Sequence, residues 1–171
     1  MNNQEANFSE CARGKVRDGE CMKFEASEIE ERMSIATRTL LKKDLLLLRN
    51  DSDEWSISHK LAEYLQKQFP DWHVDVEYNR DKNQVKKLNN ENVRPDIIVH
   101  IRDTDNNLLV IEVKKSNNPK FIDDDRKRLL RFTSQNGRYK YLFGVLVIFH
   151  VAEEYRKQPT IELFQNNVQL R

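Results

Sequence analysis

Two apolar runs at 96–101 and 108–114 constrain the fold of this chain more than any other feature. Both are rich in β-branched residues, and the six residues between them are polar types that form turns. Such a pattern predicts a β-hairpin. Because the strands of a hairpin are antiparallel, the start of the first run would lie beside the end of the second. We therefore expect Asp96 to lie close to Glu112 and Lys114.

These three residues have the chemistry of phosphodiester hydrolysis. Side chains alternate between the faces of a strand, so Glu112 and Lys114 would point the same way. Magnesium prefers oxygen ligands and is commonly held by one or two carboxylates together with substrate phosphates. Asp96 and Glu112 would supply carboxylates for Mg²⁺ (or Mn²⁺). Lys114 is suited to orient the attacking water or to stabilise the transition state.

Pro95-Asp96 followed by Glu112-Val113-Lys114 resembles the signature of the PD-(D/E)xK nuclease superfamily, which has the restriction-endonuclease-like fold. The resemblance implies a divalent-metal-dependent endonuclease or exonuclease that hydrolyses nucleic acid, DNA in preference to RNA. It also implies that Asp96 and Glu112 are metal ligands, that the carbonyl of Val113 is a further ligand, and that Lys114 is catalytic.

The family core runs helix, three antiparallel strands, helix, and a strand parallel to the third. The resemblance therefore implies an α/β (α+β, mixed-sheet) protein with an αβββαβ core. Helical spacing of apolar residues predicts the first helix at 55–69, with Ser52 or Asp53 as its N-cap and Pro70 as its stop. Alternation of apolar and polar residues predicts a half-buried strand at 74–78.

Three more elements are expected after the hairpin. Pro119 suits the first turn of a helix, and Asn136-Gly137 suits its end. The nearly unbroken apolar run at 141–151 predicts an inner parallel strand. A short alternating run at 160–164 predicts an edge strand.

The family commonly adds one more acid, which would be both a metal ligand and a catalytic residue. Glu54 ranks first because it lies at the start of the first helix, which antiparallel packing places at the active end. Glu77, at the end of the first strand, ranks second. Glu63 ranks third, because it lies roughly 13 Å further along the helix at 1.5 Å per residue. Glu54 could equally complement the helix dipole.

The net charge of +1 argues against a protein that is basic all over, yet the charges segregate. Residues 114–140 hold nine basic and three acidic residues, whereas 51–113 hold eight basic and thirteen acidic ones. The basic stretch suits phosphate contacts that weaken with salt, although a solvated helix face would look the same. The candidate substrate-binding residues are Lys115, Ser116, Lys120, Tyr78, Arg80, Arg126 and Arg131.

Residues 1–50 would form an N-terminal extension and residues 51–171 the nuclease-like domain. Residues 1–26 are polar and are expected to be loose or disordered. A capping box at Ser27-Glu28-Ile29-Glu30 predicts the start of a helix that continues to Arg49. Its apolar face would either pack on the core or form a dimer or partner contact.

Cys11 and Cys21 have neither zinc-site nor disulfide-framework spacing. No apolar run is long enough to span a bilayer, and the first residues lack the features of a signal peptide. We therefore expect a cytoplasmic protein in a reducing compartment, without a membrane partner. A homodimer, as in many enzymes that cut both strands of a duplex, stays open.

Two other classes of function remain open. A nuclease-like fold can serve as a regulatory module that binds nucleic acid or protein without cleavage. Alternatively, the charged residues at the strand ends could be purely structural. His100 could lie near substrate, but a hydrogen-bonded structural role is the preferred interpretation, and His59 is interpreted as a solvated histidine.

Overall fold

The computed structural model describes residues 24–78 and 93–170, together with the backbone of six two-residue strands. These short strands form three antiparallel pairs: β1 (Val16–Arg17) with β2 (Glu20–Cys21), β4 (Arg80–Asp81) with β5 (Gln84–Val85), and β6 (Lys87–Leu88) with β7 (Glu91–Asn92). The described residues form a mixed α/β structure with one six-stranded sheet and four α-helices.

The sheet has the strand order β12-β11-β10-β9-β8-β3. Its central pair, β9 and β10, is parallel, and all other neighbours are antiparallel. The strand bounds are β3 His73–Val76, β8 Ile97–His100, β9 Asn107–Lys115, β10 Phe143–Phe149, β11 Thr160–Gln165 and β12 Val168–Gln169.

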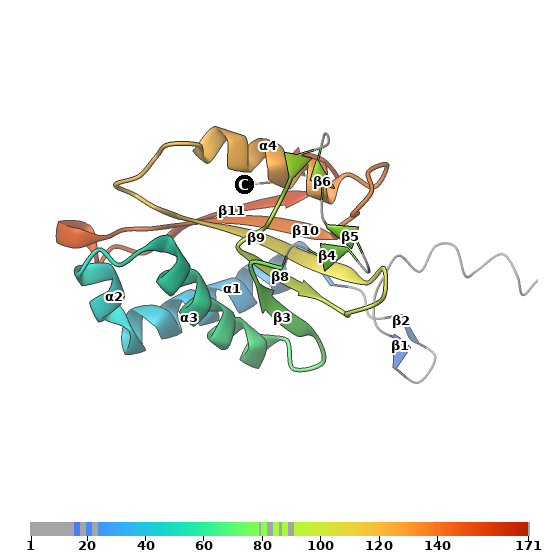
Figure 1. Cartoon of the computed structure of the whole chain (residues 1–171). Coiled ribbons are helices and arrows are strands. Elements are labelled where there is room, and N and C mark those ends of the chain that lie inside the picture. Colours follow the sequence, from blue (N-terminus) through green and yellow to red (C-terminus); the bar gives the residue numbers. More distant parts are fainter. Residues whose placement is uncertain are drawn as a thin grey trace, which may run out of the picture.

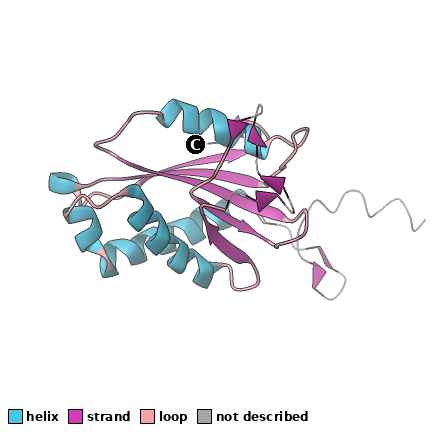
Figure 2. Cartoon of the chain, viewed as in Figure 1, coloured by secondary structure: helices cyan, strands magenta, loops and turns pink. Residues whose placement is uncertain are grey.

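Helices cover both faces of the sheet (Figures 1 and 2). One face carries α1 (Ala26–Lys43), α2 (Leu45–Arg49) and α3 (Glu54–Gln68), and the other carries α4 (Ile122–Thr133). A 3₁₀ turn, η1 (Ala152–Glu154), follows β10. The two faces have separate cores, so the alternation of side chains along each strand decides which core a residue joins.

Alternation in β9 has the predicted consequence. Ile111 and Val113 are buried in the core under α1 and α3, whereas Val110 is buried in the core under α4. Glu112 and Lys114 therefore belong to the α4 face. That helix lies close to the sheet at Gly144 of β10, where an added Cβ would be 3.1 Å from Thr133 Cγ2. Gly144 pairs with Val110 of β9, so this close approach lets the last turn of α4 pack directly on the sheet.

The series α3, β3, β8, β9, α4, β10 has the order of elements predicted from the sequence: a helix, three antiparallel strands, a helix and a strand parallel to the third. The expected N-cap of α3 is also confirmed, because Asp53 Oδ1 accepts a hydrogen bond from Ser56 N at 2.7 Å. Assignment of this series to the restriction-endonuclease-like fold stays a prediction.

The N-terminal helix packs on the core, which resolves one alternative. Its buried residues, including Met33 and Leu40, join the same core as α3, so the division at residue 50 does not separate two cores. Two local predictions were wrong. The helix begins after Glu25 without a side-chain cap, and it breaks at Asp44 rather than continuing to Arg49. Asp44 accepts a hydrogen bond from Tyr64 Oη, which fixes the break against α3.

Other element boundaries also differ from expectation. β3 ends at Val76 because Glu77 adopts a positive φ of 50°. α4 begins at Ile122 rather than at Pro119, because Phe121 before it is left-handed with a φ of 69°, and it ends at Thr133. The strand expected at 160–164, β11, has an outer neighbour only at its end, where Phe164 and Gln165 pair with the two-residue strand β12.

Most of 1–26 and both cysteine side chains lie outside the described residues. Within residues 24–78 and 93–170, no helix is both long and apolar enough to cross a membrane.

Candidate active site

The hairpin brings Asp96 and Glu112 together. β8 and β9 pair Ile97 with Ile111, so the next positions in the register are Asp96 and Glu112. Asp96 Oδ2 accepts a hydrogen bond from the backbone N–H of Val113 at 2.7 Å, which ties its carboxylate to the end of β9. Glu77 N donates to the carbonyl of Asp96 at 2.8 Å and fixes its backbone from the other side.

Lys114 lies between two carboxylates from two helices. Its Nζ is 3.1 Å from Glu54 Oε2, on the first turn of α3, and 3.4 Å from Asp125 Oδ2, on α4. Glu54 also accepts from Lys115 N at 3.4 Å and from Asn118 Nδ2 at 3.2 Å. The first-ranked additional acid therefore lies beside the Glu112-Val113-Lys114 triplet.

Helix α4 adds two residues that sequence reasoning did not assign. Arg128 Nε donates to Glu112 Oε1 at 3.2 Å, and Arg128 Nη2 donates to Asp125 Oδ1. Asp125 is fully buried, and its Oδ2 makes no hydrogen bond in the described part of the chain. We refer to these residues together as the acidic cluster: Glu54, Asp96, Glu112, Lys114, Asp125 and Arg128.

A signal for Asp125 does exist in the sequence. Asp125, Leu129 and Phe132 follow one another at helical spacing and are all buried on the sheet side of α4. An aspartate in phase with the apolar stripe of a helix is a buried charge that needs a partner. The partner could not be read from the sequence, because the contact between Arg128 and Glu112 depends on how α4 crosses β9.

The acidic cluster combines four carboxyl groups with two cations. Burial, reinforced by the nearby Asp96 carboxylate and opposed by Arg128, raises the pKa of Glu112 to about 8. Burial likewise raises the pKa of Asp96 against the opposing effects of the Val113 N–H and Lys114. It also raises the pKa of Asp125 in spite of Arg128 and Lys114. Three carboxyl groups are thus harder to ionise than usual.

Lys114 responds in the opposite sense. Burial alone would lower its pKa, but the carboxylates of Asp125 and Glu54 outweigh burial, and the pKa of Lys114 is raised. The ammonium form is therefore stabilised at this position.

The charge and donor set of the cluster fit a divalent cation. The cluster has four carboxyl groups but two cations, and Asp125 Oδ2 is buried with Lys114 Nζ at 3.4 Å as its ionic partner, so an added cation would favour the ionised form of these acids. In the described conformation the carboxylates of Glu112 and Asp125 bind Arg128 and that of Asp96 binds a backbone N–H. Accordingly, no three acidic, histidine or cysteine side chains of the described residues form a ready metal-ligand group.

The candidate substrate-binding residues near the triplet are only partly placed at the cluster. Lys115 contacts Glu54 through its backbone N–H, but its Nζ is 2.9 Å from Asp51 Oδ1. Ser116 N donates to Phe149 O at 2.8 Å and continues the pairing of β9 with β10. Lys120 Nζ lies over the Phe121 ring.

The remaining candidates lie elsewhere. Arg126 binds Glu162 through Nε and Nη2 at 2.8 and 2.6 Å, which compensates its charge. The ring of Tyr78 packs on the ring of His100, with 5.0 Å between the ring centroids. His100 is four residues after Asp96 in the chain. Arg131 is exposed on the last turn of α4. The side chain of Arg80 lies outside the described residues.

The lower-ranked acids and the histidines are not part of the cluster. Glu77 pairs with Arg94 at 3.3 Å. Glu63 pairs with Lys60 at 3.0 Å and lines a groove of about 420 Å³ between α3 and β3. His59 is exposed and stacks on Trp55. His100 has the hydrogen-bonded position that was preferred for it, with Nε2 2.9 Å from Asp75 Oδ2.

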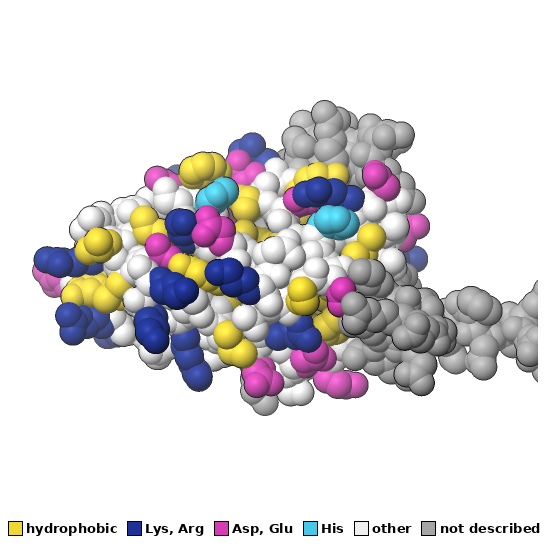
Figure 3. Space-filling model, turned by 90° about the horizontal axis from the view of Figure 1, so that it is seen from below, with side chains coloured by type: hydrophobic (Ala, Val, Ile, Leu, Met, Phe, Trp, Pro, Cys, Tyr) yellow, Lys and Arg dark blue, Asp and Glu magenta, His cyan; other side chains and the backbone are white. Residues whose placement is uncertain are grey.

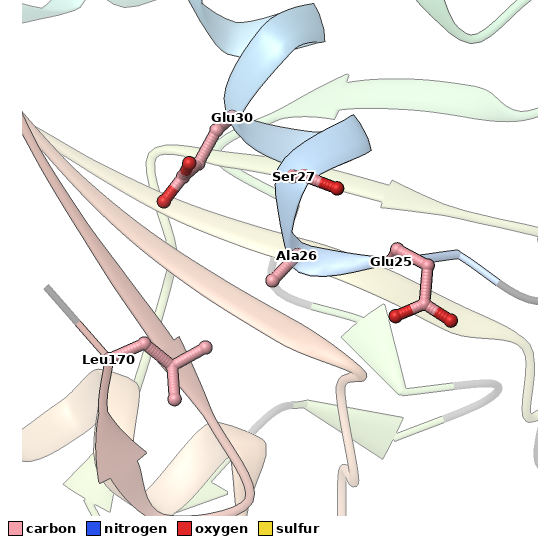
Figure 4. A pocket seen from close by; sticks show the side chains of 5 residues that line it. All are labelled: Glu25, Ala26, Ser27, Glu30 and Leu170. Atoms are coloured by element: carbon pink, nitrogen blue, oxygen red, sulfur yellow. The ribbon is translucent and has the colours of Figure 1, made fainter.

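A pocket of about 330 Å³ lies at the start of α1 and includes no residue of the acidic cluster. Figure 4 shows the side chains that line it, four from the start of α1 and one, Leu170, from the segment after β12. Its acids, Glu25 and Glu30, come from the N-terminal extension, so this pocket supplies none of the residues discussed above.

A scan against protein-family models found no match to this sequence, and a search of curated proteins found no similar one. Functional inference therefore depends on the geometry of the cluster and on the sequence signature.

Proposed function

We propose that this protein is a divalent-metal-dependent nuclease of the PD-(D/E)xK type, which hydrolyses phosphodiester bonds in nucleic acid, DNA in preference to RNA. The observation that carries the proposal is the meeting of Asp96, Glu112 and Lys114 at one end of the sheet, with Glu54 against the lysine. The order of elements from α3 to β10 supports a restriction-endonuclease-like core. A cytoplasmic location and a homodimer stay predictions.

Mg²⁺ or Mn²⁺ would be held by the carboxylates of Asp96 and Glu112, with Glu54 and the carbonyl of Val113 as further donors. The ion would supply a more acidic bound water and neutralise charge on the phosphate. The excess of carboxyl groups over cations supports this assignment, because a bound ion would favour the ionised form of groups whose pKa values are raised without it.

Lys114 would act through its charge. Since neighbouring carboxylates raise its pKa, it keeps its proton at neutral pH and cannot serve as a general base. An ammonium held by Glu54 and Asp125 is suited to donate a hydrogen bond to the attacking water or to an oxygen of the reacting phosphate. Glu54 and Asp125 would then position Lys114.

A second candidate function has one specific observation in its favour. Arg128 binds both Glu112 and Asp125, as expected if the charges of the cluster served only to hold the fold. In that case the protein would be a nuclease-like binding module without cleavage.

Cleavage assays separate the two functions. We expect purified protein to cut DNA or RNA in the presence of Mg²⁺ or Mn²⁺ and to be inactive in EDTA. Loss of one electrostatic donor commonly lowers the rate by about 10²–10³-fold, and we expect at least this loss for Lys114→Ala and for Glu112→Ala.

Glu63→Gln is the matched control, because it removes an exposed acid from the same helix as Glu54 but away from the cluster. It should cleave like the parent. Cleavage that survives both Glu112→Ala and Lys114→Ala would refute the assigned site, and metal-independent binding without cleavage would favour the binding module.

A further inference from the structure

Basic residues in the described part of the chain differ in their partners. Two of those predicted from the sequence to contact phosphate bind acids of the protein itself: Arg126 binds Glu162 and Asp123, and Lys115 binds Asp51. Lys127, which belongs to the same basic stretch at 114–140, binds Asp124. The charges of these three residues are therefore compensated before any ligand arrives.

A second group lies on the N-terminal helices, where no contact with substrate was expected. Arg38, Lys42, Lys43 and Arg49 are all exposed on α1 and α2. Within the described residues, none of these four side chains makes a hydrogen bond or an ion pair. We call these four residues the α1–α2 basic surface.

Location connects this surface with the acidic cluster. Two residues beyond Arg49, Asp51 binds Lys115, the last residue of β9, and Asn117, two residues after it. The end of α2 is thus held near the same end of β9 as Glu112 and Lys114, although α1 and α2 cover the face of the sheet opposite to α4. Figure 3 shows Lys and Arg side chains gathered on the left of the face seen from below, the side on which Figure 1 places α2.

Helix electrostatics alone account for only part of this arrangement. Lys42 and Lys43 lie in the last turn of α1, where they complement the helix dipole. Arg38 lies before that turn, and Arg49 belongs to another helix. Four like charges without acidic partners repel one another, and a polyanion would relieve this repulsion.

We propose that the α1–α2 basic surface binds backbone phosphates of a nucleic acid substrate, outside the bond that is cut. This inference rests on the proposed nuclease function, for which it names a second contact with the substrate. Duplex DNA fits because it presents a charge about every 1.7 Å along its axis, so one molecule can meet several of these cations at once. The sequence of the substrate would not be read here, since phosphate contacts position without specifying.

The test measures binding separately from cleavage. In a Glu112→Ala background without metal ions, the affinity for a 30-base-pair duplex would be measured between 50 and 300 mM salt. Each lost phosphate contact lowers the salt slope by about 0.9, so replacing all four basic residues by glutamine should lower it by about 3–4. At low salt we expect an affinity loss of at least about tenfold.

A matched variant replaces four lysines that already contact acids or rings: Lys60, Lys67, Lys127 and Lys157. Both variants lose four positive charges, but only the first should lose affinity and slope. Two partial variants, Lys42→Gln/Lys43→Gln and Arg38→Gln/Arg49→Gln, should each lose about half of the slope. They keep the test valid if the fourfold variant does not fold.

Equal slopes in both fourfold variants would overturn the proposal. Binding to phosphatidylserine vesicles that requires these four residues, with unchanged DNA binding, would overturn it in favour of a membrane surface. The two proposals can fail separately. A protein that never cleaves but shows the slope difference would contradict only the nuclease function. A protein that cleaves but shows equal slopes in both fourfold variants would contradict only the role of the α1–α2 basic surface.

Discussion

Two clusters of buried charge occupy opposite ends of β8 and differ in their balance. Near His100, the carboxylate of Asp75 accepts from His100 Nε2 and from Arg102 Nε, each at 2.9 Å. Burial alone would raise the pKa of Asp75, but these hydrogen bonds outweigh burial and hold it well below its usual value. Near Asp96, burial and mutual repulsion of the carboxylates raise the pKa values instead.

This difference in charge balance distinguishes a structural ion cluster from a candidate functional site. Asp75 has more partners than it needs, so its charge is stabilised within the fold. The acidic cluster has more carboxyl groups than cations, and the buried Oδ2 of Asp125 has Lys114 Nζ at 3.4 Å as its ionic partner. Raised pKa values mean that ionising these buried acids costs free energy unless a further cation joins them, and perturbed groups of this kind gather at functional sites.

The largest contrast is expected from Glu112→Gln, which should abolish cleavage without weakening the fold. Its raised pKa means that folded protein keeps a proton that unfolded protein releases between pH 4.5 and about 8, so stability falls as pH rises through this window. The variant lacks this penalty. In EDTA, its stability relative to the parent should increase from pH 5 to pH 8.5, by an amount on the order of 1–4 kcal/mol in urea unfolding.

A stability difference that is the same at both pH values would show that Glu112 ionises normally and would remove the contrast between the two clusters.

Asp75→Asn should have the opposite profile, with lower stability and normal cleavage per folded molecule. Loss of the carboxylate leaves His100 and Arg102 without a charged partner, at a cost of about 1–3 kcal/mol near neutral pH. Because the pKa of Asp75 is lowered in the fold, its stabilisation is present above about pH 4 and is lost in more acidic solution. Urea unfolding from pH 7 down to pH 2 measures this difference.

The exposed pair of Glu63 with Lys60 supplies the control, since such pairs contribute about 0–1 kcal/mol. An Asp75→Asn variant no less stable than Glu63→Gln would mean that the two clusters do not differ in structural role.

The smallest effect is expected from Arg128→Gln. Removal of this cation from between Glu112 and Asp125 should favour a metal ion there, and we expect Mn²⁺ to bind up to about tenfold more tightly, equivalent to about 1.4 kcal/mol. Arg126→Gln is the matched control, because it lies two residues away but binds Glu162 on β11. Titration calorimetry with the metal alone measures both; weaker binding to Arg128→Gln would contradict an ion site at Glu112.

Features that depend on local spacing could be predicted from the sequence. Period-two alternation located β9 and assigned Glu112 and Lys114 to one face, and turn chemistry between 101 and 107 fixed the antiparallel partner of Asp96. The apolar run at 141–151 identified the parallel strand β10. Each inference needed only neighbours in the chain, for which physical rules are short-ranged.

Boundaries set by tertiary contacts could not be predicted in this way. Asp44 ends α1 through its hydrogen bond with Tyr64, twenty residues later in the chain. Phe24, two residues before the start of α1, contacts the rings of Phe69 and Trp72, and a capping-box signature could not reveal those contacts.

The sequence by itself determined which residues share a strand face and which strands pair, and so that Asp96, Glu112 and Lys114 would meet. Only the tertiary structure decided the charge balance around them. The placement of α4 brought Asp125 and Arg128 to the cluster and turned Arg126 toward Glu162. The physical reason is that a charge is compensated by whatever lies within a few ångströms, and residues distant in the chain come that close only through packing.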